Sequence, residues 1–509
     1  MKGTGTLLLA LFLGICFASH CGATVYQSDG LPSNIQQIHN NQAQNGDTIT
    51  LPAGIFAWTT GVVISKAITL QGAGVGNTIV RDAGQSDSLI DWTLAAGFVS
   101  RLTGIEFQDG GRATNRPGIF YVSGSNTNGS QFRMDHCNLN ALNGFPSFDT
   151  VIGVIDHCTF TVTHYNTIFI FGYGWNGHLY GDGSWAAPTN YGSSQFLFIE
   201  DNTFISNDPV YLYPLTDAYA GARFVVRHNT AGGFFVANHG TESTTRPRGC
   251  RAMEIYNNTF NGHNLNDFVG GSRSGGTLFH DNTITNYWNG VSFTLQNYRS
   301  FYPFNPWGGA DGTNVWDVNE PNAFFTGTAA QNSSGTTVTV SGNPNWTTNQ
   351  WVGYTLRRTS NICNSNTLNF SIITSNTSNT ITYYPSCCQT PAMSFCAGDS
   401  LEIRKVDHAI DQPGRALGSL ISGDNPTPPP NWNDQVTEPC YSWNNGGVNF
   451  TAHVPSIRLN EHYFNDTALP GYTEFTYPHP LVTGAGTPTP TATATPCRVQ
   501  PRRRHPVQR

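Results

Sequence analysis

The densest run of ionisable side chains in this 509-residue sequence lies between residues 239 and 251. Cleavage of an acidic polysaccharide by β-elimination needs a cation beside the uronate carboxylate, a base for the C5 proton and an acid for the leaving oxygen. Arginine can supply the cation through two parallel hydrogen bonds. In a chain with only 11% charged residues, the cluster therefore predicts a catalytic site. Its members are His239, Glu242, Arg246, Arg248 and Arg251.

The same cluster also has a structural interpretation. The arginines could pair with Glu242 or Glu254 and only order a loop, because ion-pair networks also gather charged residues. Asp135 and Asp156 offer a second possibility, since equivalent positions of neighbouring repeats would bring their carboxylates about 5 Å apart, as in a cation site or a retaining hydrolase. For this pair we favour a polar, solvated sheet face. Nucleophilic serine chemistry has no support, because the sequence contains no Gly-x-Ser-x-Gly motif.

Aromatic side chains gather in the segments 172–194 and 291–321. Loops this long in a compact repeat fold are usually functional or disordered, and disordered segments rarely hold so many aromatic residues. Aromatic rings suit the apolar C–H faces of sugars, although both segments could merely cover apolar sides of the fold. We predict five substrate-binding residues. They are Trp175, His178, Tyr180, Trp185 and Arg273.

A short unit recurs along the chain and would position these residues. Around each anchor residue, the residues three before and two after it are apolar, and the residue two before it is mostly polar. This alternation has the period of a β-strand with one face inward. The anchors are Ile105, Cys137, Cys158, Asn202, Asn229, Asn258 and Asn282.

The spacing of the anchors predicts a solenoid in which each turn stacks on the previous one. Most intervals are 21 to 32 residues, and we interpret the interval of 44 between Cys158 and Asn202 as two turns of 22 with one degenerate copy. Stacked asparagines inside a bend can satisfy their amides from their neighbours. We therefore predict an all-β fold, a parallel β-helix in which the four asparagine anchors form a column.

On these motifs the chain resembles the right-handed parallel β-helix, pectin-lyase-like superfamily, over roughly residues 47–320. Pectate lyases carry a W-I-D-H segment, an H-H-N turn and R-x-P-x-x-R before an N-N turn. Three segments of this sequence match them in order. They are Val154-Ile155-Asp156-His157, Arg227-His228-Asn229, and Arg246-Pro247-Arg248-Gly249-Cys250-Arg251 before Asn257-Asn258.

The match to pectate lyases is partial. Arg246 directly precedes Pro247, and the last arginine is displaced relative to the asparagine pair. The paired aspartates that would hold calcium have no clear counterpart, so calcium stays open as a cofactor and we assign no metal ligand. The resemblance implies polysaccharide cleavage by a lyase, more specifically than the residues alone do.

Composition and the N-terminus indicate an exported protein. The net charge of −7 argues against nucleic acid as a partner. Lys2, the apolar run 7–18 and the small residues of Cys21-Gly22-Ala23 have the order of a secretory signal peptide. That run is too short to span a bilayer. We expect a secreted or cell-surface monomer without a membrane span, in a compartment that permits disulfides.

The composition and residue pattern of the sequence change at residue 323. Alternating segments rich in Ser, Thr and Asn predict a small antiparallel β module inserted into the solenoid. Cys363, Cys387, Cys388 and Cys396 suggest a disulfide framework of open connectivity, whereas Cys137 and Cys158 could bridge or stack, and we favour stacking. The expected divisions are a signal peptide (1–23), β-helix (24–322), inserted module (323–406), further β-helix turns (407–483) and a Thr/Pro-rich linker with a basic tail (484–509).

Together these features favour a secreted enzyme that degrades polysaccharide, most specifically a lyase acting on uronic-acid polymers. A protein of another class is the alternative, namely a non-catalytic β-helix protein that binds glycans or builds the cell surface. The formation of unsaturated ends would separate the two.

Overall fold

The structure is a computed structural model of the chain. It describes residues 22–84, 88–112, 116–142, 144–162, 168–171, 188–240, 249–263, 268–287, 292–297, 323–363, 369–384, 393–404, 413–416, 436–453 and 457–484.

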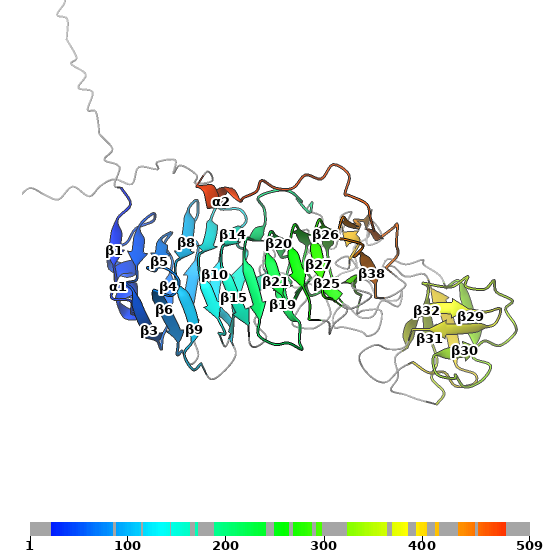
Figure 1. Ribbon diagram of the computed structural model, residues 1–509. Coiled ribbons are helices and arrows are strands. Elements are labelled where there is room, and N and C mark those ends of the chain that lie inside the picture. The colour runs from blue at the N-terminus through cyan, green and yellow to red at the C-terminus, as the bar shows by residue number, and fades with distance from the viewer. Residues whose placement is uncertain are drawn as a thin grey trace, which may run out of the picture.

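Three parallel sheets wind together into one long solenoid (Figure 1). Within the described residues, sheet A contains β1 (Val25–Gln27), β2 (Thr48–Thr50), β5 (Thr69–Gln71), β8 (Val99–Thr103), β11 (Gln131–Asp135), β14 (Gly153–Asp156), β17 (Leu197–Glu200), β20 (Arg223–Arg227), β23 (Ala252–Tyr256), β26 (Gly276–His280), β37 (Cys440–Trp443) and β39 (Tyr463–Phe464). Sheet B contains β3 (Gly54–Trp58), β6 (Thr78–Asp82), β9 (Glu106–Asp109), β12 (Asn138–Asn140), β15 (Thr159–Val162), β18 (Thr203–Ser206), β21 (Thr230–Gly232), β24 (Thr259–Asn261) and β27 (Thr283–Thr285). Sheet C contains β4 (Val62–Ile64), β7 (Ile90–Thr93), β10 (Arg116–Ser123), β13 (Gly144–Asp149), β16 (Ile168–Phe171), β19 (Tyr213–Ala218), β22 (Phe234–Ala237), β25 (Phe268–Ser272), β28 (Ser292–Leu295) and β38 (Phe450–Ala452).

The register between turns confirms the repeat. Met134 pairs with Leu102 on one side and with Ile155 on the other, so the apolar residues three before each anchor form one column. Ile155 pairs directly with Ile199. The interval of 44 residues is therefore a single turn, and the prediction of two turns of 22 is wrong. The extra residues fall between strands, where an insertion does not disturb the hydrophobic column that sets the register.

The corner between sheets A and B explains the anchors. The residue before the anchor adopts the left-handed region at His136, His157, Asp201, His228, Asn257, Asp281 and Asn444, with φ between 49 and 56°. Asparagine, aspartate and histidine tolerate this region better than other residues with side chains. The corner therefore favours polar residue types that the sequence pattern alone did not single out.

An asparagine column runs along the inside of this corner, as predicted. The side-chain Nδ2 of Asn202 donates to Oδ1 of Asn229 at 3.1 Å, and the same contact joins Asn229 to Asn258 and Asn258 to Asn282 at 3.0 Å each. Asn445 extends the column beyond the residues that the sequence identified, accepting from Asn282 at 2.9 Å. Each amide also donates to backbone carbonyls of its own and the preceding turn. The column thus satisfies buried backbone groups at the bend.

The core lies between the three sheets and consists of the inward residues of each strand. Neighbouring turns stack like on like, as the rings of Phe160 and Phe204 do at 4.8 Å. Cys137 and Cys158 are free and buried in this core, so they stack rather than bridge.

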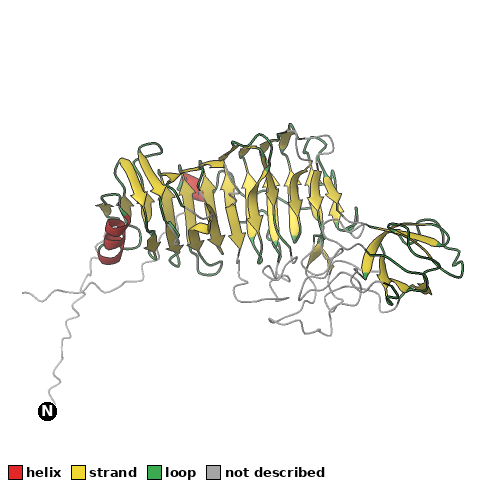
Figure 2. Ribbon diagram, turned by 90° about the horizontal axis from the view of Figure 1, so that it is seen from below, coloured by secondary structure: helices red, strands yellow, loops and turns green. Residues whose placement is uncertain are grey.

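A single helix, α1 (Pro32–Asn41), covers the N-terminal end of the solenoid (Figures 1 and 2). It buries Ile35 and Ile38 against the first turns. The helix begins at Pro32, and the N-cap residue Leu31 makes no side-chain hydrogen bond to it. The fixed φ of proline makes it a good first helical residue.

The inserted segment forms an antiparallel sheet of its own, which lies beyond the C-terminal end of the solenoid (Figure 2). A disulfide joins Cys363 to Cys396 within it, while Cys387 and Cys388 lie outside the described residues. The predicted fold class, a parallel β-helix with a small antiparallel insert, is confirmed. The strand order is β29 (Phe325–Thr328), β34 (Ser400–Arg404), β31 (Thr355–Arg358), β32 (Phe370–Asn376), β33 (Thr380–Tyr383) and β30 (Thr337–Thr339), and a separate two-stranded pair joins β35 (Arg415–Ala416) to β36 (Val436–Thr437).

After the last turn the chain reverses and runs back along the outside of the solenoid as far as β14 (Figure 1). We call residues 466–484 the strap. It ends in the short helix α2 (Pro480–Thr483), whose Leu481 packs with Val154, Phe198 and Val225 on the outward side of sheet A. The strap therefore gives sheet A a second buried face.

Candidate functional site

The outward face of sheet C positions a histidine and an aspartate on neighbouring turns. Nδ1 of His239, which follows β22, forms a hydrogen bond with Oδ1 of Asp217 in β19. The backbone N–H of His239 donates to the carbonyl of Ala218 at 2.8 Å, which holds the two turns together at this point. The side chain of Asp217 is 5% exposed and that of His239 is 16% exposed. A carboxylate that accepts from Nδ1–H fixes the ring so that Nε2 is the reactive nitrogen.

Arg273 occupies the equivalent place on the next turn. Its backbone N–H donates to Oδ1 of Asn238 at 2.7 Å, and its Nε donates to Oε1 of Gln296 at 3.0 Å. Gln296 is on the turn after that, and His453 follows one turn further along. The pKa of His453 is lowered by burial first and by the charge of Arg273 second. A cation and two imidazoles thus lie along one edge of sheet C.

Toward the N-terminal turns the row continues with tyrosine and carboxylate groups. Tyr219 lies opposite His239, because Thr216 pairs with Val236 in the adjoining strands. The hydroxyl of Tyr121 donates to Asp149 at 3.2 Å, and burial, followed by the charge of Asp149, raises the pKa of Tyr121 to about 12. Burial also raises the pKa of Asp91. The outward face of sheet C therefore changes from acidic to basic along the solenoid axis.

Arg251 begins close to His239, since the backbone N–H of Cys250 donates to the carbonyl of His239 at 3.2 Å, but it forms an ion pair with a residue outside this row. Its side chain is 2% exposed, and its guanidinium forms a bidentate ion pair with Glu438. Arg223 lies nearby, and its pKa is lowered to about 10 by burial first and by the charge of Arg251 second. Arg251 thus lies in a buried ionic cluster just before β23 of sheet A, and its predicted catalytic role stays a prediction.

Seven other predicted site residues lie outside the described residues. The catalytic candidates among them are Glu242, Arg246 and Arg248, and the substrate-binding candidates are Trp175, His178, Tyr180 and Trp185. Of the ten candidates, the structure thus places His239 and Arg273 together on sheet C and Arg251 elsewhere.

Sequence reasoning missed Asp217. It lies 22 residues before its histidine partner, and the repeat was anchored on the strands of sheets A and B alone. The short segment Tyr213–Ala218 aligns with Phe234–Ala237 on the next turn, so extending the repeat to sheet C would have placed Asp217 beside His239.

The outward face of sheet A carries paired charges instead. Arg101 binds Asp135 through Nε and Nη2 at 2.7 and 2.6 Å, and Arg133 binds Asp156 in the same way at 2.9 and 2.8 Å. Both carboxylates are fully buried. The interpretation of these aspartates as a solvated face is therefore wrong, because neighbouring arginines and the strap cover them. Their lone pairs are already engaged, which also leaves no open cation site between them.

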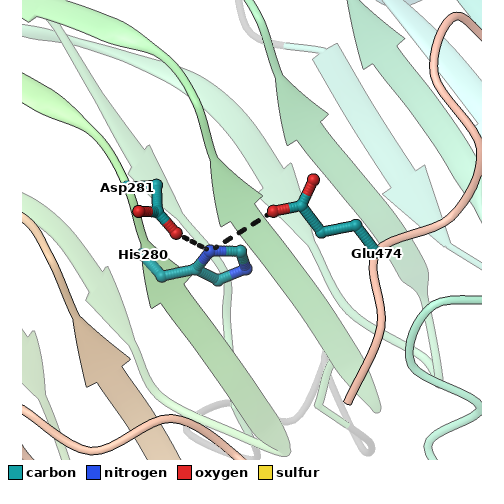
Figure 3. Close-up of side chains that lie close together, drawn as sticks. All are labelled: His280, Asp281 and Glu474. Carbon is teal, nitrogen blue, oxygen red and sulfur yellow. Dashed lines mark hydrogen bonds and ion pairs between the residues drawn. The ribbon is translucent and has the colours of Figure 1, made fainter.

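Three residues of types that commonly bind metal ions lie close together where the strap crosses β26 (Figure 3). Nδ1 of His280 is 2.8 Å from Oδ2 of Asp281 and 3.8 Å from Oε1 of Glu474 on the strap. The imidazole stacks between Tyr256 at 4.8 Å and Trp443 at 4.0 Å, and burial lowers its pKa to about 4. We therefore interpret the ring as neutral, with Nδ1–H facing the two carboxylates. In this interpretation the group attaches the strap to β26 through hydrogen bonds.

Comparison with known proteins finds only distant structural likenesses. No protein-family model matches the chain, and no curated protein matches it. Among solved structures, the enzymatically active domain of tailspike protein 4 of bacteriophage CBA120 aligns at 10% identity over 75% of this chain and 65% of that chain, with a TM-score of 0.31. A mutant tailspike protein of E. coli bacteriophage HK620, solved with a pentasaccharide, aligns at 12% identity over 74% of this chain and 89% of that chain, with a TM-score of 0.23. Both likenesses are too weak to support a statement about activity.

Among the described residues, no helix has the length and apolar character needed to cross a membrane.

Proposed function

We propose that this protein binds an acidic polysaccharide along the outward face of sheet C and cleaves it by β-elimination. The single observation that carries the proposal is the pairing of His239 with Asp217, next to Arg273 on the following turn. These groups supply a base with its orienting partner and a cation, and the reaction also requires an acid for the leaving oxygen. The sequence of the N-terminus supports an exported protein, which would meet such a polymer outside the cell.

The proposed reaction assigns one role to each group. The guanidinium of Arg273 neutralises the uronate carboxylate, which acidifies the C5 proton. Nε2 of His239 takes that proton while Asp217 stabilises the imidazolium. The electron pair of the C5–H bond forms the C4–C5 double bond, and the C4–O bond breaks. The hydroxyl of Tyr219 then gives its proton to the leaving oxygen.

The length of the polar row supports an extended substrate. Outward side chains follow one another over turns from β7 to β38, at the spacing of about 4.8 Å between neighbouring strands. A polymer lying along the solenoid axis would contact several turns at once, whereas a small metabolite would use only one or two.

A screen of purified protein against uronic-acid polymers tests the proposal by the ultraviolet absorbance of unsaturated ends. We expect wild type to form this product, and Asp217→Asn and Arg273→Ala each to lower kcat by about 10²-fold or more. Arg81→Ala is the matched control, because Arg81 also donates to a glutamine, Gln108 at 3.5 Å, but on sheet B. The control should retain wild-type kcat.

Other outcomes would replace the proposal. New reducing ends without absorbance would identify a hydrolase. Binding without any cleavage, unaffected by Arg273→Ala, would favour a non-catalytic glycan-binding protein.

A further inference from the structure

Two histidines stack on neighbouring turns at the corner between sheets A and B. His136 follows β11 and His157 follows β14. Their ring centroids are 5.2 Å apart and the planes differ by 7°. The side chains are 61% and 45% exposed, so both rings are open to solvent. This pair lies away from the polar row on sheet C and takes no part in the proposed reaction.

Each imidazole is held from behind by a buried carboxylate. Nδ1 of His136 is 2.8 Å from Oδ2 of Asp135, and Nδ1 of His157 is 2.9 Å from Oδ2 of Asp156. One arginine donates to both oxygens of each carboxylate, so these oxygens act as acceptors toward the imidazole. The hydrogen must therefore be on Nδ1, and Nε2 of each ring carries a lone pair on the side away from the carboxylate.

We propose that His136 and His157 form a binding site for a divalent transition-metal cation such as Cu²⁺, Ni²⁺ or Zn²⁺. Imidazole nitrogen is a preferred ligand of these ions. Histidine ligands characteristically donate their other ring N–H to a carboxylate, which fixes the tautomer and raises the basicity of the ligating nitrogen. The two rings follow one another on neighbouring turns, and because their planes are nearly parallel, each must turn about its side-chain bonds before both Nε2 atoms reach one ion. Water completes the coordination.

The next turn adds a carboxylate at the same position. Asp156 pairs with Glu200, so Asp201 follows the column of His136 and His157 with the same left-handed backbone. Oδ1 of Asp201 accepts from the hydroxyl of Tyr477 at 2.8 Å. Its negative charge favours a cation beside His157, whereas two exposed histidines alone would have no such support.

The His280 group in Figure 3 makes a poorer metal site. There Nδ1 faces the carboxylates, while Nε2 is buried and has no hydrogen-bond partner among the described residues. A metal ion on Nδ1 would move the ring hydrogen to Nε2, where a buried donor would be left unsatisfied. At His136 and His157 the carboxylates face Nδ1 and solvent faces Nε2, so no such cost arises.

Titration of the purified full-length protein with CuSO₄ and with ZnSO₄, followed by calorimetry, tests the proposal. The variants are His136→Asn, His157→Asn and the double variant, because these positions have φ of 49 and 51° and asparagine tolerates that region. His228→Asn is the matched control, since His228 has φ of 55° at the same corner but stacks on Tyr477 at 3.6 Å. Thermal unfolding without metal verifies that each variant is folded.

We expect one saturable ion per chain, bound more tightly as Cu²⁺ than as Zn²⁺. Each single variant should lower the affinity about tenfold or more, and the double variant should abolish the saturable phase, while His228→Asn leaves it unchanged. The Cu²⁺ complex should show two equivalent nitrogens by electron paramagnetic resonance. Wild-type affinity in a folded double variant, or no saturable binding by wild type, would overturn the proposal.

Discussion

The outward faces of sheets A and C carry similar side chains in opposite surroundings. On sheet A, Glu200 and Arg227 are fully buried, and the strap satisfies what remains of the arginine through the carbonyls of Phe475 and Thr476 at 2.7 and 2.9 Å. On sheet C, His239 and Arg273 keep part of their surface exposed. The first set of charges therefore contacts only protein, while the second can contact a ligand.

This difference shows why a charged cluster alone does not identify a site. A buried charge must be paired, because an unpaired ion loses its hydration without compensation. Such a group holds elements together, as Arg227 joins β17, β23 and the strap. A partly exposed charge contributes little to stability, so its presence in an ordered row points to recognition or catalysis.

The largest expected effect on stability should come from breaking the ion pair between Arg227 and Glu200, which the strap covers on sheet A. Arg227→Ala should lower the free energy of unfolding by about 3–5 kcal/mol, because it leaves Glu200 buried without its cation. The matched change Arg273→Ala on sheet C should cost less than about 1 kcal/mol. Urea denaturation of both variants measures the difference.

If Arg227→Ala does not fold, Glu200→Gln gives the same comparison. Glu200 also accepts from the backbone N–H of His479 at 2.8 Å, and a glutamine oxygen can keep that hydrogen bond while the charge is removed. Equal losses for the sheet A and sheet C variants would show that the two faces do not differ in the way described.

The next largest effect should come from the asparagine column below the covered face. Asn258→Leu removes an amide that donates to Val226, Tyr256 and Asn282 at 2.9 to 3.0 Å. We expect a loss of about 1–3 kcal/mol, because buried backbone acceptors lose their donor. Thermal and urea unfolding measure it, with Asn261→Leu on sheet B, where residue 261 is exposed, as the control. A loss confined to the control would contradict the role of the column.

A smaller effect should appear in the pH dependence of stability. Burial raises the pKa of Glu254 from 4.5 to about 7, although Tyr472 on the strap donates to its carboxylate. Between pH 4.5 and 7 the folded protein binds more protons at this group than the unfolded chain, so its contribution to stability falls as pH rises through this window. Glu254→Gln should remove that component when unfolding is measured across the window. An unchanged pH profile in the variant would show that Glu254 titrates normally.

The fold was accessible from sequence because one local pattern repeats. Each copy places an apolar residue inward, and parallel pairing turns that alternation into a column, as from Leu102 through Met134 to Ile155. The interval of 44 residues led to the wrong prediction of an extra turn, because an insertion between strands lengthens the sequence without changing the register.

The site was less accessible because its partners are far apart in sequence. Arg251 stands near His239 in the chain, yet it binds Glu438, 187 residues later. The strap is not visible in the sequence either, since its contacts with Arg133 and Arg227 span more than two hundred residues. Local density of charge therefore pointed to the segment that contains His239, while the proposed roles depend on the pairing of turns.

The rate of unsaturated product formation by two histidine variants tests the central distinction most directly. His239 lies on the open face of sheet C, whereas His479 lies under the strap, where burial lowers its pKa to about 3 and its Nδ1 accepts from the backbone of Leu481 at 3.2 Å. Assayed on the uronic-acid polymer that wild type cleaves best, His239→Ala should lower kcat by about 10²–10⁴-fold with an unchanged free energy of unfolding. His479→Ala should lose stability and keep its kcat at a temperature where it is folded. Wild-type kcat in His239→Ala would contradict the account.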